Sequence, residues 1–153
     1  MALAAGQPMS GSEVGDIPAS ETAIVAGSKA CIGATVDPDG EDGRLAGWQA
    51  VPVPPDAHPF GTVLTRDNVL LSVKKGVDGG CFVMAKVDAA FDKTRFLSHL
   101  GQIAGVPVDG RQPVNLSNGE LMTVQADPAQ AGGYVMVIMF NQHSKLFMHS
   151  QGN

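Results

Sequence analysis

The run of seven apolar residues from Tyr134 to Phe140 (YVMVIMF) constrains the fold of this chain more than any other feature. Successive side chains of a β-strand point to opposite faces of the sheet. A strand that is apolar on both faces must therefore be covered on both sides, and we expect residues 134–140 to form a central strand. The 19 glycines and 10 prolines disfavour long helices and favour strands joined by turns.

Strand and turn signals recur through the second half of the chain. Asp67-Asn68 is a tight-turn signal between two apolar segments, and Asn118-Gly119 is a strong hairpin signal. We expect strands at 62–66, 69–75, 81–87, 114–116, 120–125 and 134–140, with an edge strand at 145–149. Residues 51–59 contain four prolines, so we expect a stiff extended connector there.

Three helices are expected. The first covers residues 21–35 after Ser20, although Gly27 and Gly33 weaken it, since glycine costs about 1 kcal/mol relative to alanine in a helix. A second, short helix is expected through residues 44–48, capped by Asp39 or Asp42. The third is amphipathic, runs through about 88–104 and is capped by Asp88, with Phe96, Leu100 and Ile103 on one face.

The predicted fold is α+β, with two short N-terminal helices followed by an antiparallel sheet of five to six strands. The amphipathic helix is inserted after the third strand. Residues 1–20 are rich in Gly, Ser, Ala and Pro and are expected to be a flexible leader. Residues 21–153 are expected to form a single domain.

The net charge of −5 is unevenly distributed. Residues 1–60 hold eight acids and two bases, which gives −6, and residues 61–153 hold seven acids and eight bases, which gives +1. Because nucleic-acid surfaces need clustered Lys and Arg, this pattern argues against a nucleic-acid partner. No stretch approaches the roughly twenty apolar residues of a membrane span.

The sequence leaves two compartments open. The opening Met1–Gly6 lacks the features of an intact signal peptide. The chain is then either cytoplasmic or a mature exported protein whose signal peptide was removed. The small-residue opening and the even number of cysteines favour a periplasmic or secreted protein.

The two cysteines, Cys31 and Cys81, allow three interpretations. A disulfide between them would close a loop of about fifty residues and would stabilise the fold by about 4 kcal/mol. They could instead be two buried thiols, or Cys81 could be a catalytic thiol that acts with His143 or His149. Composition and the leader favour the disulfide.

Metal and cofactor signatures are incomplete. Counted from Asp37, a calcium loop would need glycine and glutamate where Asp42 and Trp48 stand. His143 and His149 have no third ligand nearby in the sequence. We therefore expect no metal and no cofactor.

Methionines recur on the predicted strands. Met84, Met122, Met136 and Met139 would form a candidate ligand face if they shared one side of the sheet, because methionine adapts to apolar partners. The alternative is ordinary core packing.

The order of these features resembles that of a known group of proteins. A helix with one cysteine is followed by an acidic, glycine-rich turn, Ala46-Gly47-Trp48, paired strands, Gly80-Cys81-Phe82-Val83, a helix with Phe96 and Leu100, and final strands. This order is similar to that of small exported domains of unknown function from Gram-negative bacteria, in which two cysteines join helix to sheet. The resemblance covers roughly residues 21–149 and implies a periplasmic setting and a disulfide.

The scattered polar residues favour a non-catalytic exported domain that binds a protein, with an inhibitor-like or immunity-like role. A homodimer through the last edge strand is compatible with this function. The alternative is a carrier of a small apolar ligand, with the 88–104 helix as a lid over the methionine face. A third hypothesis is a thiol or metal hydrolase.

Overall fold

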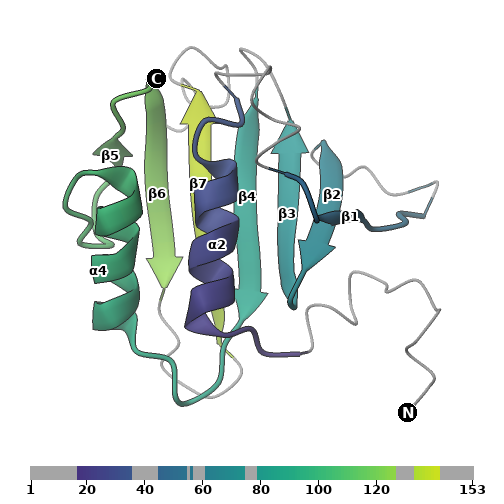
Figure 1. Ribbon diagram of the computed structural model, residues 1–153, viewed down its shortest axis with the longest axis horizontal. Helices are drawn as coiled ribbons and strands as arrows, with labels where there is room; N and C mark the ends of the chain where they lie inside the picture. Colours follow the sequence, from purple (N-terminus) through teal and green to yellow (C-terminus); the bar gives the residue numbers. More distant parts are fainter. Residues whose placement is uncertain are drawn as a thin grey trace.

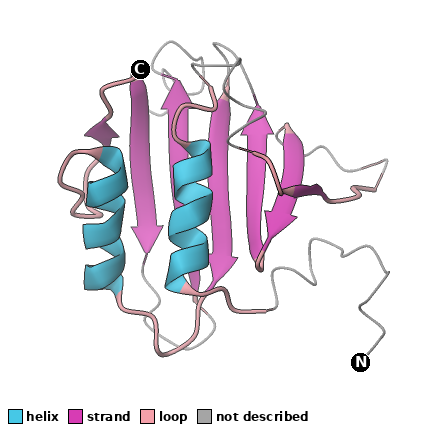
Figure 2. Ribbon diagram, in the orientation of Figure 1, coloured by secondary structure: helices cyan, strands magenta, loops and turns pink. Residues whose placement is uncertain are grey.

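The computed structural model describes residues 17–35, 45–54, 56, 61–74, 79–126 and 133–141. Within these residues the fold is α+β, with two helices packed on a seven-stranded antiparallel sheet (Figures 1 and 2). The elements are α2 (Glu21–Cys31), β1 (Gln49–Ala50), β2 (Thr62–Arg66), β3 (Val69–Lys74), β4 (Gly80–Lys86), α4 (Lys93–Ala104), β5 (Val114–Asn115), β6 (Glu120–Ala126) and β7 (Tyr134–Asn141). The strand order is β1-β2-β3-β4-β7-β6-β5.

The apolar run at residues 134–140 forms β7, which pairs with β4 on one side and β6 on the other. Its predicted interior position is confirmed. The sheet has seven strands instead of five to six. The strand that the sequence did not indicate is β1, because two residues before a proline-rich run show no alternation. The edge strand predicted at 145–149 lies outside the described residues.

Helix α2 begins where Ser20 predicts it, with the Ser20 hydroxyl accepting a hydrogen bond from the Ala23 N–H at 3.1 Å. It ends at Cys31 and not at residue 35, because Gly33 takes a φ of 91° that only glycine adopts readily. Gly27 has a packing role. A Cβ at this position would lie 3.1 Å from a Val69 methyl and 3.3 Å from a Val83 methyl, so the missing side chain lets α2 lie close against β3 and β4.

The N-terminus of α4 differs from the prediction. The helix starts at Lys93, and its cap is Asp92, which accepts from the Arg95 N–H at 3.0 Å. Asp88, the predicted cap, instead accepts from the Ala90 N–H at 3.0 Å in the preceding turn. Because an Asp can close a turn as readily as it caps a helix, the sequence does not distinguish the two. The helix follows the fourth strand, since β1 adds one strand before it.

The prediction of a second N-terminal helix at 44–48 is wrong for residues 45–48, which the structure describes. Residues 45–47 form a turn, in which the Trp48 N–H donates to the Leu45 carbonyl at 3.1 Å. Gly47 has a φ of 86°, which is incompatible with a helix. The proposed caps, Asp39 and Asp42, lie outside the described residues.

Both predicted hairpin turns are confirmed. Asp67 and Asn68 have φ values of 52° and 70° and join β2 to β3 as a tight two-residue turn. Gly119 has a φ of 96° between β5 and β6, where the Leu116 N–H donates to the Glu120 carbonyl at 2.8 Å. These turns fix the register, and the register determines which side chains share a face.

Candidate functional site

The two described helices cover the same face of the sheet (Figure 1). Residues paired across an antiparallel ladder point to the same side. Leu71, Val83 and Val137 form one such row across β3, β4 and β7, and all three are fully buried. Phe96 and Leu100 of α4 are also fully buried in the same core. This is the helix-covered face.

The opposite face carries the alternate residues of the same strands. Leu70, Met84 and Met136 form one row of this face, and Phe82 pairs with Ile138 in the next. Phe140 contacts Phe82 edge to face, with ring centroids 6.0 Å apart. These six residues are only partly buried, and neither α2 nor α4 covers them. We call them the open-face patch: Leu70, Phe82, Met84, Met136, Ile138 and Phe140.

A mostly polar rim borders the open-face patch. On one side, Thr123 and Gln125 of β6 pair with Ile138 and Met136, and the buried Leu121 pairs with Phe140. On the other side the patch is bordered by Thr65 of β2 and Ser72 of β3. At one end of the strands, Lys86 pairs with Tyr134, whose side chain is 52% exposed. At the other end, Lys74 of β3 pairs with Gly80 of β4.

The register separates the four methionines of the predicted ligand face. Met84 and Met136 pair with each other on the open face. Met122 and Met139 also pair with each other, but both are fully buried on the helix-covered face. Met136 and Met139 lie three residues apart, an odd number, so they point to opposite sides of β7. Helix α4 packs on the side of Met122 and Met139 and is therefore not a lid over Met84 and Met136.

Cys31 and Cys81 form a disulfide with a Cα–Cα distance of 5.5 Å, as expected. Both residues are fully buried, and the bond joins the last residue of α2 to β4. The Cys81 sulfur is therefore unavailable as a nucleophile in this state. His143 and His149, its proposed partners, lie outside the described residues.

A buried carboxylate lies near the disulfide and was missed by the sequence analysis. Glu120 is fully buried. Its Oε1 accepts from the Gly33 N–H at 2.6 Å and from the Asn118 amide at 2.9 Å, and its Oε2 accepts from the Thr35 hydroxyl at 2.8 Å. These bonds tie the segment after α2 to β6. The sequence shows only a Glu after an Asn-Gly turn, which does not indicate burial.

A polar cluster joins the two helices. Glu21 of α2 accepts from Arg95 Nε at 2.8 Å and contacts His99 Nδ1 at 2.5 Å, both on α4. The hydrogen bond and the negative charge of Glu21 raise the pKa of Arg95. Glu21 and Arg95 also line a cleft of about 400 Å³ together with Asp88 and Phe91. The cleft is lined by two acids and one cation, so its charges favour neither an anionic nor a cationic ligand.

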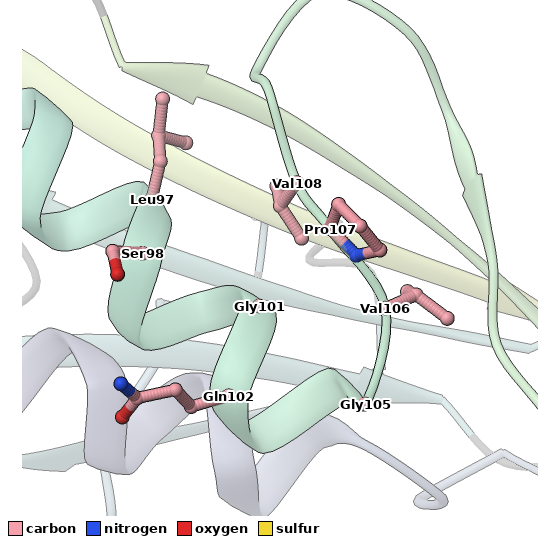
Figure 3. Close-up of a pocket in the computed structure, with 8 residues that line it drawn as sticks. All are labelled: Leu97, Ser98, Gly101, Gln102, Gly105, Val106, Pro107 and Val108. Carbon is pink, nitrogen blue, oxygen red and sulfur yellow. The ribbon is translucent and has the colours of Figure 1, made fainter.

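A second depression runs along α4 (Figure 3). It has a volume of about 470 Å³ and lies between the helix and the segment that follows it. Gly101 contributes to its floor, since a Cβ there would lie 3.2 Å from the Val106 carbonyl oxygen. Its lining is mostly apolar: Leu97, Ser98, Gly101, Gln102, Gly105, Val106, Pro107 and Val108. It is a groove open to solvent.

The described residues hold neither a metal-binding cluster nor a membrane-spanning helix. No group of three or more His, Cys, Asp or Glu side chains lies close enough to hold a metal ion there. Among the same residues, no helix has the length and apolar character needed to cross a membrane. Comparison with protein-family models, with curated proteins and with solved structures found no match to this chain. The resemblance to small exported domains therefore stays a prediction.

Proposed function

We propose that this chain is a non-catalytic exported domain that binds another protein through the open face of its sheet. The observation that carries the proposal is the open-face patch. Its residues come from the strands at the centre of the sheet, β3, β4 and β7. A run such as 134–140 needs cover on both faces, and the described helices supply it on one. A protein partner would supply the second cover.

The composition of the face supports a protein partner. Protein interfaces have an apolar core rich in aromatic residues and methionine, surrounded by a polar rim. The open-face patch holds two phenylalanines and two methionines, and Thr65, Ser72, Thr123 and Gln125 lie beside it. All six side chains of the patch are partly buried, and the apolar surface that they leave has a mostly polar border, as at interaction sites of soluble proteins.

The disulfide supports the exported setting. Such bonds persist in oxidising compartments and are rare in the cytoplasm. The bond between Cys31 and Cys81 is buried. A preformed domain that is fastened by a disulfide and presents one apolar face suits an inhibitor-like or immunity-like role, in which a rigid surface blocks or masks a partner.

The test is partner capture with a face-specific variant. A tagged chain is exported in its native host and purified without reductant, beside the variants Ile138→Ser and Ile17→Ser. Ile138 lies in the open-face patch, whereas Ile17 is an apolar residue, 44% exposed, ahead of α2. We expect a stoichiometric protein partner with the wild type and Ile17→Ser and its loss with Ile138→Ser, while circular dichroism shows that all three fold. Equal capture by all three chains would contradict the proposal.

The carrier function is the second candidate, and the groove along α4 is the observation in its favour. Small-molecule sites bury most of the ligand surface, whereas this groove is open to solvent. Native mass spectrometry of the purified chain distinguishes the two functions. A bound lipid or small molecule with no protein partner would favour the carrier.

A further inference from the structure

We infer that Met84 and Met136 form an oxidation-sensitive site, at which a hydroperoxide converts the thioethers to sulfoxides and so weakens binding of the protein that covers the open-face patch. The inference rests on the proposed function and names a regulation of the same face. Two observations carry it. The two methionines are direct partners in the sheet, and the other two described methionines, Met122 and Met139, are fully buried.

The methionine pair lies in the middle of the open-face patch. Met84 of β4 pairs with Met136 of β7, and Leu70 of β3 completes the row. Side chains of directly paired residues start about 4.5–5.5 Å apart at their Cβ atoms, so the two thioethers are neighbours. Phe82 and Ile138 form the next row of the same face. An oxygen atom added to either sulfur therefore enters the apolar centre of the patch and not its polar rim.

The two sides of the sheet give the methionines different access to solvent. Met84 and Met136 are partly exposed, whereas Met122 and Met139 have no exposed surface. The two cysteines of the chain are bonded to each other, so no free thiol consumes the oxidant first. An oxidant that reaches the folded chain therefore meets the thioethers of Met84 and Met136 before those of the buried pair.

The reaction is the transfer of one oxygen atom. A lone pair of the sulfur attacks one oxygen of hydrogen peroxide, an S–O bond forms and the O–O bond breaks. The proton on the transferred oxygen passes to the departing hydroxide, which leaves as water. The sulfur is oxidised by two electrons, and the peroxide is reduced by the same two. A methionine sulfoxide reductase, with a dithiol as the electron donor, restores the thioether and releases the oxygen as water.

A sulfoxide at this position opposes docking, because it converts an apolar side chain into a polar one. A partner that covers the patch takes the S–O group out of water, and its neighbours Leu70, Phe82 and Ile138 have no side-chain hydrogen bond to donate. Because burial of an unpaired polar group is unfavourable, we expect one sulfoxide to weaken binding about tenfold. In the uncovered chain the sulfoxide stays in contact with water, so the fold persists.

The first test compares the four methionines within one chain. The full chain is purified with its disulfide intact and treated with hydrogen peroxide, and tandem mass spectrometry follows the sulfoxide at each position. We expect Met84 and Met136 to be oxidised at least about tenfold faster than Met122 and Met139, which the peroxide reaches only when the core opens. Circular dichroism should show that the oxidised chain is still folded. Equal rates at all four positions would overturn the inference.

The second test measures binding to the protein that the tagged wild type captures from its native host. Only the tagged chain is treated with peroxide, which is then removed with catalase. The readout is the ratio of the dissociation constants after and before treatment, so any difference in starting affinity cancels. We expect a ratio of about ten for the wild type and for the buried control Met122→Leu, Met139→Leu. The double variant Met84→Leu, Met136→Leu should give a ratio of about one, because leucine has a similar volume but no thioether.

The outcomes separate this inference from the proposed function. If peroxide leaves wild-type binding unchanged while Ile138→Ser loses the partner, the oxidation-sensitive site is overturned and the proposed function stands. The same conclusion follows if Met84→Leu, Met136→Leu loses as much affinity on treatment as the wild type, because another group is then the sensitive one. If no partner is captured, or if Ile138→Ser captures it as well as the wild type, both are overturned.

Discussion

Phe82 and Phe140 lie on neighbouring strands of the face that neither described helix covers, and their rings meet edge to face with centroids 6.0 Å apart. Such aromatic pairs stabilise by about 0.5–1.5 kcal/mol beyond their buried area. The contact joins side chains of β4 and β7, which pair directly in the sheet. A stiff apolar surface loses little conformational freedom when a partner covers it, which suits the proposed docking face.

Replacing a methionine of β7 by alanine should lower the free energy of unfolding by different amounts on the two faces of the strand. Met139→Ala removes a fully buried side chain and should lower the free energy of unfolding by about 2–5 kcal/mol. Met136→Ala, on the open face, should cost roughly half of that or less, because its side chain is already partly exposed to water. Urea unfolding under oxidising conditions measures both. Equal losses would show that the open face is covered within the isolated chain.

Glu120 predicts a second test of stability. In Glu120→Gln an amide N–H₂ replaces one of the oxygens that accept from Gly33, Asn118 and Thr35. Gly33 can only donate at this position, and Asn118 is oriented by accepting from the Glu120 N–H. An amide nitrogen in place of Oε1 would face the Gly33 N–H. In place of Oε2 it could donate to the Thr35 hydroxyl, but it would face the Thr35 N–H, which lies 3.4 Å from Oε2. Each orientation leaves a buried donor facing a donor, so we expect the free energy of unfolding to fall by about 1–3 kcal/mol.

A double-mutant cycle separates the direct interaction between Glu120 and Thr35 from general effects on packing. Thr35→Val removes the hydroxyl that donates to Glu120 Oε2 and leaves a side chain of nearly the same shape. If the two side chains interact directly, the double variant, which carries both Glu120→Gln and Thr35→Val, loses a free energy of unfolding that differs from the sum of the two single losses. Such a difference is usual for groups in direct contact. Strictly additive losses in the free energy of unfolding would contradict a direct interaction between Glu120 and Thr35.

The sheet was the most predictable part of this fold, and the reason is local. The turns at Asp67-Asn68 and Asn118-Gly119 need positive φ at defined positions, and few residue types supply it. The alternation in β3 and β4 follows directly from burial of one face. Both signals lie within a few residues of the structure that they specify.

Most errors occurred where the outcome depends on distant residues. The odd spacing of Met136 and Met139 within one predicted strand already places them on opposite faces, and the sequence analysis overlooked it. Which of the two shares a face with Met84 and which with Met122 depends on the register between strands. The burial of Glu120 depends on donors 85 and 87 residues away in the sequence. The two-residue strand β1 forms because Gln49 and Ala50 meet Thr65 and Leu64 of β2, and its own sequence carries no strand signal.

The disulfide predicts a large dependence of stability on the redox state. The bond spans 50 residues, so the double variant Cys31→Ser, Cys81→Ser should lose about 4 kcal/mol. Part of this effect acts on the unfolded chain, which expands without the bond, so the dependence of the free energy on urea should steepen. Thiol titration of the denatured, unreduced wild type should find none of its two cysteines free. Two free thiols would contradict the bond and weaken the case for an exported protein.

Asp109 predicts how stability changes in acid. Its carboxylate accepts from the backbone N–H groups of Arg111 and Gln112 at 2.9 and 3.3 Å, and these bonds lower its pKa below the ordinary value of 3.8. The unfolded chain therefore binds a proton at a higher pH than the folded chain. The stabilisation is fully present above pH 3.8 and is lost as the pH falls through the lower folded-state pKa. Asp109→Asn keeps an acceptor oxygen but does not titrate, so its urea midpoint should fall less steeply than that of the wild type below about pH 4. If the urea midpoints of the two proteins fall in parallel with pH, these hydrogen bonds do not lower the pKa of Asp109 in solution.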